Sequence, residues 1–465
     1  MIPSWVKDAI FYQIFPDRFF NGNIENDPEN VKKWEANPTI SGFQGGDLEG
    51  IIKKFDYLLE LGINAIYLNP IFRSTSTHRY DTVDYFQIDP KLGDLETFHR
   101  LIDTAHRSGV KIILDGVFNH TARGFFAFND ILENGEESPY KNWYHIYHFP
   151  VDAYSPGKAK DYSAWWDFKS LPKLNVEHKP VRDYLLSVSK YWIEQGADGW
   201  RLDVPNEIND DSFWEQFRNE VKSINSEAYL CGEIWEASSK WVDNKHFDGL
   251  MNYPLRDAIL KFLGGKTNSD ILNKMILELE AIYSFDQMSG MYNLLGSHDT
   301  ERILTIFNGN TNLVKLALLI LLTFPGAPSL YYGDEIGVLG GKDPDCRKTF
   351  PWVKNQQNLD LFEWTKKLIQ FRKIFNPLRN GKLMKLQPKG NKDLFAYARM
   401  DEQKIFVIII NRSKQYQIIN LDLSLIDFHS AIILNNLLGE EKFELDKNRK
   451  LTNISIPPES GFLLH

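Results

Sequence analysis

The hexapeptide Asp198-Gly199-Trp200-Arg201-Leu202-Asp203 combines residue types and spacing that could carry chemistry. It is typical of a short buried strand, and residues two apart on a strand point to the same side. The Arg201 guanidinium would therefore face the Asp203 carboxylate and keep it ionised by charge attraction. An ionised carboxylate held at a strand end is suited to act as a nucleophile, although a buried structural ion pair would look the same.

Three further apolar segments, at residues 112–115, 229–233 and 293–299, end in polar residues in the same way. If the four segments are parallel strands of one barrel, their carboxyl ends meet at its mouth and form one site. The polar residues at or just beyond these ends are Asp115, Asn119 and His120; Glu233 and Trp235; and His298 and Asp299.

Strand-like and helix-like segments alternate along most of the chain. Residues 48–59 show helical spacing that ends at Gly62, for example. Eight strands with helices between them predict an α/β fold, a (β/α)8 TIM barrel. An open doubly wound sheet is the alternative, but no glycine-rich phosphate loop follows the first strand. The strand-like segments are residues 9–15, 65–69, 110–115, 199–203, 229–233, 247–251, 291–295 and 329–332.

Two regions interrupt this alternation. The region after the third strand is rich in Trp, Tyr, Phe, His and Pro and shows no helical period, which is typical of an inserted loop subdomain. The end of the chain shows short strand-like segments separated by turns, which predict an all-β sandwich. We expect a catalytic barrel in two parts, residues 1–120 and 175–378, an inserted subdomain at 121–174, and a C-terminal β-sandwich domain at 379–465.

Composition limits the class of protein. The chain has 465 residues and a formal net charge of -9, which argues against nucleic acid or an anionic membrane as a partner. Cys231 and Cys346 are the only cysteines, so no disulfide framework is expected. No signal peptide or membrane-spanning stretch is evident, and we expect a cytoplasmic protein. The 12 Trp, 20 Tyr and 31 Phe suit stacking on sugar rings, but composition alone favours an ordinary large core.

The motifs as a set resemble the signature regions of the α-amylase family, glycoside hydrolase family 13. His78-Arg79-Tyr80-Asp81 resembles the family segment that holds the sugar at the cleavage point. Leu171-Pro172-Lys173-Leu174-Asn175 and Val204-Pro205-Asn206-Glu207 resemble the neopullulanase, cyclomaltodextrinase and maltogenic amylase subfamily. That subfamily usually carries an N-terminal β-domain. Here the first strand-like segment begins at residue 9, so we expect that domain to be missing. The matching signature regions are residues 115–120, 199–203, 233–235 and 297–299.

The resemblance implies a role for each matching residue. Asp203 would be the nucleophile and Glu233 the general acid and then the base, while Asp299 would stabilise the transition state. The chemistry needs two carboxyls with different pKa values, one ionised and one protonated. The residues implied to bind substrate are Tyr80, Asp81, His120, Arg201, Asn206, Glu207, Trp235, His298, Asp343 and Arg347.

A structural Ca²⁺ site is a further expectation. Two segments near the start of the chain, residues 21–27 and 45–47, are dense in oxygen ligands, which Ca²⁺ prefers. An ordinary Asn- and Asp-rich turn is the alternative. The resemblance favours a site, although Asn23 stands where the subfamily usually has an aspartate. The implied ligands are Asn21, Asn23, Asn26, Asp27, Gly45 and Asp47.

The implied activity is retaining hydrolysis of α-glucans. The subfamily motifs favour cyclomaltodextrins, maltooligosaccharides and pullulan as substrates, cleaved at α-1,4 bonds. Cleavage of α-1,6 bonds, glycosyl transfer and the oligomeric state stay open. The alternatives are an α-amylase that acts mainly on starch and a non-catalytic glucan-binding protein.

Overall fold

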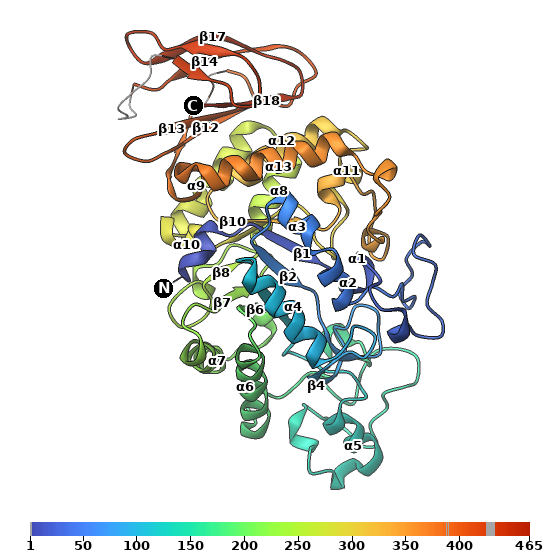
Figure 1. Ribbon diagram of the computed structural model, residues 1–465. Helices are drawn as coiled ribbons and strands as arrows, with labels where there is room; N and C mark the ends of the chain where they lie inside the picture. The colour runs from blue at the N-terminus through green and yellow to red at the C-terminus, as the bar shows by residue number, and fades with distance from the viewer. Residues whose placement is uncertain (1, 387, 389, 425–432) are drawn as a thin grey trace.

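The computed structural model describes residues 2–386, 388, 390–424 and 433–465 (Figure 1). Its central sheet has eight parallel strands in the order β8-β7-β6-β5-β2-β1-β10-β9. A parallel bridge between Met251 and Tyr292 joins the two edges and nearly closes the sheet into a barrel, as the sequence predicts. The strands are β1 (Phe11–Ile14), β2 (Ala65–Leu68), β5 (Lys111–Gly116), β6 (Gly199–Leu202), β7 (Tyr229–Gly232), β8 (Gly249–Leu250), β9 (Tyr292–Leu294) and β10 (Ala327–Tyr331).

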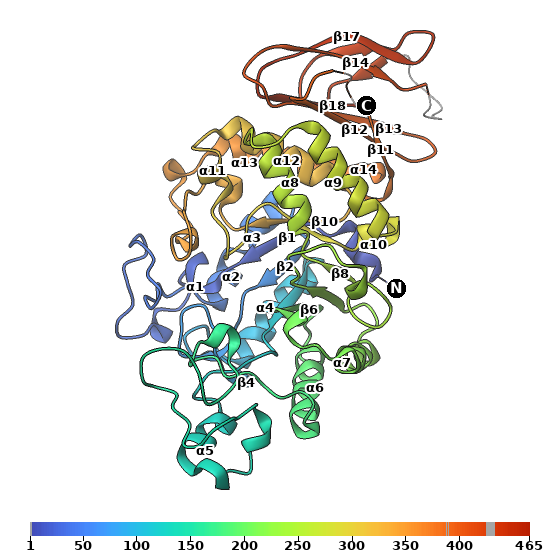
Figure 2. The same cartoon turned by 180° about the vertical axis from the view of Figure 1, so that it is seen from behind.

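Helices follow the strands and cover the outside of the barrel (Figures 1 and 2). Their apolar faces turn inward; the buried residues of α4, for instance, are Phe98, Leu101, Ile102 and Ala105, at helical spacing. The helices are α1 (Pro16–Phe19), α2 (Leu48–Lys53), α3 (Phe55–Leu61), α4 (Leu95–Arg107), α6 (Lys179–Glu194), α7 (Asp211–Ile224), α8 (Tyr253–Leu263), α9 (Ser269–Ile282), α10 (Phe285–Ser289), α11 (Ile303–Ile306), α12 (Thr311–Thr323), α13 (Leu359–Ile374) and α14 (Asn376–Asn380).

The single helix expected over residues 48–59 is wrong, because α2 and α3 are separate helices that meet at Lys54. Lys54 leaves helical geometry with φ -107° and ψ 13°. Its ammonium lies 4.2 Å above the Phe20 ring and 4.5 Å above the Trp352 ring, so cation–π contacts hold it at the break. The predicted stop at Gly62 is correct, because Gly62 caps α3 at φ 95°.

Two elements around the mouth of the barrel were not expected. A hairpin of β3 (Phe72–Ser74) and β4 (Thr82–Ile88) follows β2. The region 121–174 contains one α-helix, α5 (Phe126–Asn134). Its buried residues Ala127, Phe128 and Ile131 span little more than one turn, too short for a period to stand out in an aromatic-rich segment.

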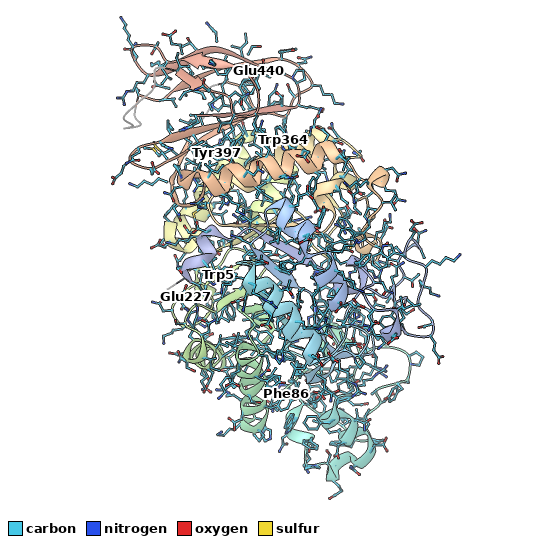
Figure 3. The ribbon with its side chains drawn as sticks, viewed as in Figure 1. Trp5, Phe86, Glu227, Trp364, Tyr397 and Glu440 are labelled. Atoms are coloured by element: carbon cyan, nitrogen blue, oxygen red, sulfur yellow. The ribbon has the colours of Figure 1, made fainter. Side chains whose placement is uncertain are left out.

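The C-terminal part is all-β, as expected. A four-stranded sheet, β11-β12-β13-β18, packs against the barrel side, and the pair β14-β17 lies above it (Figures 1 and 2). Tyr397 on β12, labelled in Figure 3, hydrogen-bonds Thr323 at the end of α12 at 2.5 Å. The strands are β11 (Lys382–Lys385), β12 (Leu394–Met400), β13 (Ile405–Asn411), β14 (Gln417–Asp422), β15 (Ile433–Asn435), β16 (Lys442–Glu444), β17 (Lys450–Ile456) and β18 (Ser460–Leu464).

Candidate active site

The register of β5, β6 and β7 brings the polar strand ends together. Asp115 pairs with Arg201 across β5 and β6, and the backbone N–H of Asp203 donates to Gly116 O at 3.0 Å. One strand further, the N–H of Glu233 donates to Leu202 O at 2.9 Å. Asp203 and Glu233 are therefore the first residues beyond two hydrogen-bonded neighbouring strands, at one end of the barrel.

The Arg201 guanidinium lies among three carboxylates. Its Nη1 is 2.9 Å from Asp115 Oδ1 and 3.0 Å from Asp203 Oδ1, and both contacts are hydrogen bonds. Its Nη2 is 2.8 Å from Glu233 Oε1, an ion pair without hydrogen-bond geometry. All four side chains are buried. Because one guanidinium faces three carboxyl groups, it can neutralise only part of their negative charge.

The expected ionising effect of Arg201 on Asp203 is present but is outweighed. Burial raises the pKa of Asp203 well above its usual value, and the neighbouring Glu233 carboxylate raises it further. Arg201 lowers this pKa, but its charge is shared with Asp115 and Glu233. Asp203 and Glu233 thus form a pair of carboxyl groups on one shared cation. Such a pair can hold the single proton that acid–base hydrolysis needs.

Asp299 lies across the site, on the segment that follows β9. Its Oδ1 accepts a hydrogen bond from Arg347 Nη2 at 3.3 Å, and its Oδ2 is 3.1 Å from His298 Nε2. The side chain is 33% exposed, so solvent or a ligand can reach it. The surrounding protein raises the pKa of Asp299 to about 7, first through desolvation and then through Glu233. Arg347 also pairs with Asp343 at 3.1 Å.

His298 is fixed by its neighbours. Its Nδ1 accepts from Gln13 Nε2 at 2.9 Å, which places the ring proton on Nε2. That nitrogen lies 2.6 Å from Tyr80 Oη, and the two rings stack 5.3 Å apart. Tyr80 Oη donates onward to Asp115 at 2.7 Å. Burial and Arg347 keep the pKa of His298 well below its usual value, so the ring is neutral.

His120 contacts the backbone of Tyr80. Its Nε2 lies 3.1 Å from Tyr80 O, and its ring stacks on Trp165 at 5.6 Å. Burial lowers the pKa of His120 to about 4, so it is neutral as well. Trp165 in turn stacks on Trp166, a residue that is 73% exposed. The inserted region therefore contributes an aromatic series that runs from the site to the surface.

The remaining predicted substrate-binding residues differ in their placement. Trp235 is 52% exposed and stacks on Tyr253 with 3.7 Å between ring centroids. Asn206 is exposed on the segment after Asp203, and Glu207 lies 3.7 Å from Lys173.

Asp81 is buried and engaged with its own loop. Both of its carboxylate oxygens accept from hydroxyls, those of Ser74 (2.6 Å), Thr75 (2.8 Å) and Ser76. These contacts fix the β3–β4 loop and occupy the group that was expected to meet substrate.

Asp115 is named from the sequence as a polar strand end, but no catalytic or binding role is predicted for it. The sequence places it at a strand end beside the others, but does not predict its hydrogen bond with Arg201. It accepts hydrogen bonds from the hydroxyls of Tyr67 and Tyr80. Val204 was missed too: it has φ 34°, rare for a branched side chain, and its N–H donates to Glu233 Oε2 at 3.2 Å.

The six residues expected to bind Ca²⁺ lie in neighbouring loops between β1 and α2. Asn21 Nδ2 donates to both oxygens of Asp27 at 2.9 Å, and Asn26 Nδ2 donates to Asp47 at 3.1 Å. These donors fix the two amides, and their Oδ1 atoms are buried with no hydrogen-bond partner. Unpartnered amide oxygens beside carboxylates fit a hard cation. A Cβ on Gly45 would lie 2.4 Å from Asp27, so glycine is needed there.

Asp47 fits such a site less well than its neighbours. Its carboxylate accepts from the backbone N–H groups of Gly22 (3.1 Å), Asn23 (2.8 Å) and Gly50 (2.6 Å), the last as the N-cap of α2. In the described part of the chain no group of three or more His, Cys, Asp or Glu is placed to hold a metal. A cation here would therefore depend on amide oxygens and the Asp27 carboxylate rather than on a cluster of carboxylates.

Comparison with known proteins agrees with this geometry. Residues 13–367 match the family model described as alpha amylase, catalytic domain. Neopullulanase 2 of Thermoactinomyces vulgaris is 42% identical over 99% of this chain and 78% of its own length. A cyclomaltodextrinase of a Bacillus species is 45% identical over 89% of this chain and 74% of its own. The structure of the cyclic α-maltosyl-(1→6)-maltose hydrolase of Arthrobacter globiformis superposes with a TM-score of 0.90 at 36% identity, covering all of both chains.

Proposed function

The chain belongs to the α-amylase family of glycoside hydrolases, and we propose that it is a retaining hydrolase of α-glucans. We propose cyclomaltodextrins, maltooligosaccharides and pullulan as its substrates, cleaved at α-1,4 bonds. The relatives named for neopullulanase and cyclomaltodextrinase activity support this choice of substrates.

In the first step Asp203 attacks the anomeric carbon of the sugar at the cleavage point. A bond forms between Asp203 Oδ and that carbon, the glycosidic C–O bond breaks, and Glu233 gives its proton to the departing oxygen. In the second step Glu233 takes a proton from water, whose oxygen attacks the same carbon and releases Asp203. The two inversions restore the α configuration.

The observation that carries this proposal is the shared guanidinium. Arg201 binds Asp203 through Nη1 and Glu233 through Nη2, so the carboxylates lie against adjacent nitrogens of one planar group. Such proximity favours direct attack by a carboxylate over attack by an intervening water. The strand register supports it independently, because both residues follow paired strand ends.

Positive charge on the sugar in the transition state meets carboxylates on both sides of the cleft. Asp299 would hydrogen-bond sugar hydroxyls while Arg347 and His298 hold it in place. His120 and His298 are neutral, so neither adds a positive charge that would oppose the charge developing on the sugar. Trp235, backed by Tyr253, offers an exposed ring face on which a sugar on the leaving side can stack.

The same arrangement permits glycosyl transfer. The covalent intermediate on Asp203 can react with any acceptor hydroxyl that Glu233 can deprotonate. A sugar bound on Trp235 would therefore compete with water as the acceptor. We infer that transfer rises with acceptor concentration. Cleavage of α-1,6 bonds needs only that the leaving sugar is linked through its 6-hydroxyl. The exposure of Trp166 and Trp235 supports room for such a sugar.

We further propose that Ca²⁺ is bound near the start of the chain and acts structurally. Asn21, Asn26 and Asp27 would hold it through side-chain oxygens, with Gly45 allowing close approach. When bound, the ion would link oxygen ligands of the two loops, and no step of hydrolysis would involve it. Asp47 already accepts hydrogen bonds from backbone N–H groups, which supports a lower affinity for Ca²⁺ than a site whose carboxylates are all free would have.

A cytoplasmic location is also part of the proposal. Cys231 and Cys346 are both buried free thiols, as is usual in reducing compartments. In the part of the chain that the structure describes, no helix has the length and apolar character needed to cross a membrane.

The proposal is tested by product analysis on β-cyclodextrin, pullulan and soluble starch. We expect β-cyclodextrin to be cleaved with the highest kcat/KM and maltose to be a main product. A clear preference for starch would favour the α-amylase alternative. Binding of all three without release of any sugar would favour a glucan-binding protein.

A further inference from the structure

A cavity of about 490 Å³ lies outside the catalytic cleft, between two loops that are far apart in the sequence. Phe20, Trp34 and Gln44 line it from the loop that follows α1, and Thr349 and Trp352 line it from the loop that follows β10. The two loops run side by side on one flank of the barrel (Figures 1 and 2). A cavity of this size is in the range of small-ligand sites.

The two indoles in the cavity are held rigidly. Trp34 Nε1 donates to Phe350 O at 3.0 Å, and Trp352 Nε1 donates to Phe19 O at 2.6 Å. Both side chains remain partly exposed. Because their polar edges are tied to backbone, what they offer a ligand is apolar ring surface. Flat apolar surfaces of this kind suit the C–H faces of sugar rings.

Gln44 adds a hydrogen-bond acceptor that has no donor. Its Nε2 donates to Lys33 O at 3.2 Å and to Ala36 O at 2.7 Å, so the orientation of the amide is fixed. Its Oε1 is buried and has no partner, and the residue is only 2% exposed. A buried acceptor without a donor is costly, and a ligand hydroxyl that reaches Oε1 from the cavity would relieve that cost.

The charges around the cavity are balanced. Lys32, Lys348, Glu35 and Asp27 line it; Lys348 is already paired with Asp345 at 3.0 Å, and Asp27 is a proposed Ca²⁺ ligand, which leaves Lys32 and Glu35. An excess of neither sign is available for a phosphate or a polyamine. The cavity therefore suits a neutral ligand with many hydroxyls.

We propose that this cavity is a second α-glucan site, separate from the cleft. This inference rests on the proposed function for the identity of the sugar. One short segment separates the two sites: Arg347 reaches Asp299 in the cleft, while Lys348 and Thr349 line the cavity. A long glucan held in the cavity would raise the concentration of its own segments near the cleft. Short substrates would gain nothing.

The test is calorimetric titration of maltoheptaose into the Asp203→Asn variant, which should bind without turnover. We expect two sites per chain. Adding Trp34→Ala should remove one site or weaken it at least about tenfold. Val353→Arg should do the same, because Val353 is exposed on the cavity lining and arginine would fill the space without removing packing. Trp364→Ala is the matched control on α13 and should keep both sites (Figure 3).

The outcomes separate the two proposals. One site in Asp203→Asn alone, or two sites that persist in both cavity variants, would overturn the second site. If Trp34→Ala lowers the Tm strongly, its loss of binding could come from unfolding, and the result with Val353→Arg then decides whether the cavity binds the glucan. In the active background, both cavity variants should keep the wild-type kcat/KM on maltotriose and lose rate on amylose. Wild-type protein that releases no sugar but still shows cavity-dependent binding would contradict only the proposed function.

Discussion

Arg201 Nη1 lies 3.0 Å from Oδ1 of Asp203, two residues further along the same strand end. The same guanidinium contacts Asp115 and Glu233, so three carboxyl groups share one cation. Only the planar, forked head of arginine can make these contacts together. The consequences can be tested one residue at a time.

We predict that Arg201→Lys lowers kcat/KM at least about 100-fold. Lysine keeps a positive charge but cannot reach all three carboxylates. Arg201 lowers the pKa of Asp203, so its loss raises that pKa. The acidic limb of the pH–rate profile should therefore move to higher pH. Arg73→Lys, an exposed control on β3, should change neither quantity. An unshifted acidic limb would show that Arg201 does not set the ionisation of Asp203.

Replacing the carboxylates themselves should separate chemistry from folding. Asp203→Asn, Glu233→Gln and Asp299→Asn should each reduce kcat by several powers of ten, because each loses a group that contacts the reacting sugar. Thermal melts should stay close to wild type. Asp103→Asn on the exposed face of α4 is the control. An Asp203→Asn variant that keeps more than about a tenth of wild-type kcat would remove Asp203 from the nucleophile role.

Glu335 should make stability depend on pH. It is fully buried and forms no ion pair with any residue that the structure describes; Tyr12 and Tyr57 donate to its Oε1, and its Oε2 has no partner there. Burial raises its pKa to about 7 from an ordinary value near 4.5. A raised carboxyl pKa contributes stability below the unfolded-state value, and that stability is lost as pH rises toward 7. The loss is roughly 3 kcal/mol across this window.

Glu335→Gln should therefore flatten the fall in stability between pH 4.5 and pH 7, compared with wild type. The measurement is denaturant unfolding at several pH values, read as the difference between the two proteins. Glu363→Gln, exposed on α13, should leave the profile unchanged. If Glu335→Gln and the wild type lost stability equally over this pH range, Glu335 would be ionised in the folded protein at neutral pH.

Chelation should lower stability without removing activity. If Ca²⁺ bridges the loops before α2, EDTA should lower the Tm by linkage, while activity at room temperature persists. Asn21→Ala should lower the Tm too, and EDTA should then have little further effect. A Tm that EDTA leaves unchanged in the wild type would mean that the Asn and Asp residues form only a turn.

The sequence predicts most of the barrel because its strands are continuous apolar runs that end in charged residues, as in residues 199–203. It does not predict the break at Lys54, which depends on Phe20 and Trp352 from two other loops. The helix α5 is missed because its apolar face is short.

The same contrast holds for the site. Asp203, Glu233 and Asp299 are predictable because each terminates a strand or its extension. Asp81 matches the motif, yet three hydroxyls of its own loop occupy its oxygens. Asp115 is visible as a strand end, but its place under Arg201 follows from the register of β5 and β6. Contacts between loops and the pairing of strands are long-range properties that local patterns do not contain.

The most direct test of the account is the anomeric configuration of the first product. Proton NMR of β-cyclodextrin or maltotriose hydrolysis, recorded before mutarotation, reports it. Direct attack by Asp203, followed by attack of water on the covalent intermediate, predicts that the α-anomer appears first. An initial β-anomer would mean a single inverting attack by water and would contradict the role assigned to Asp203.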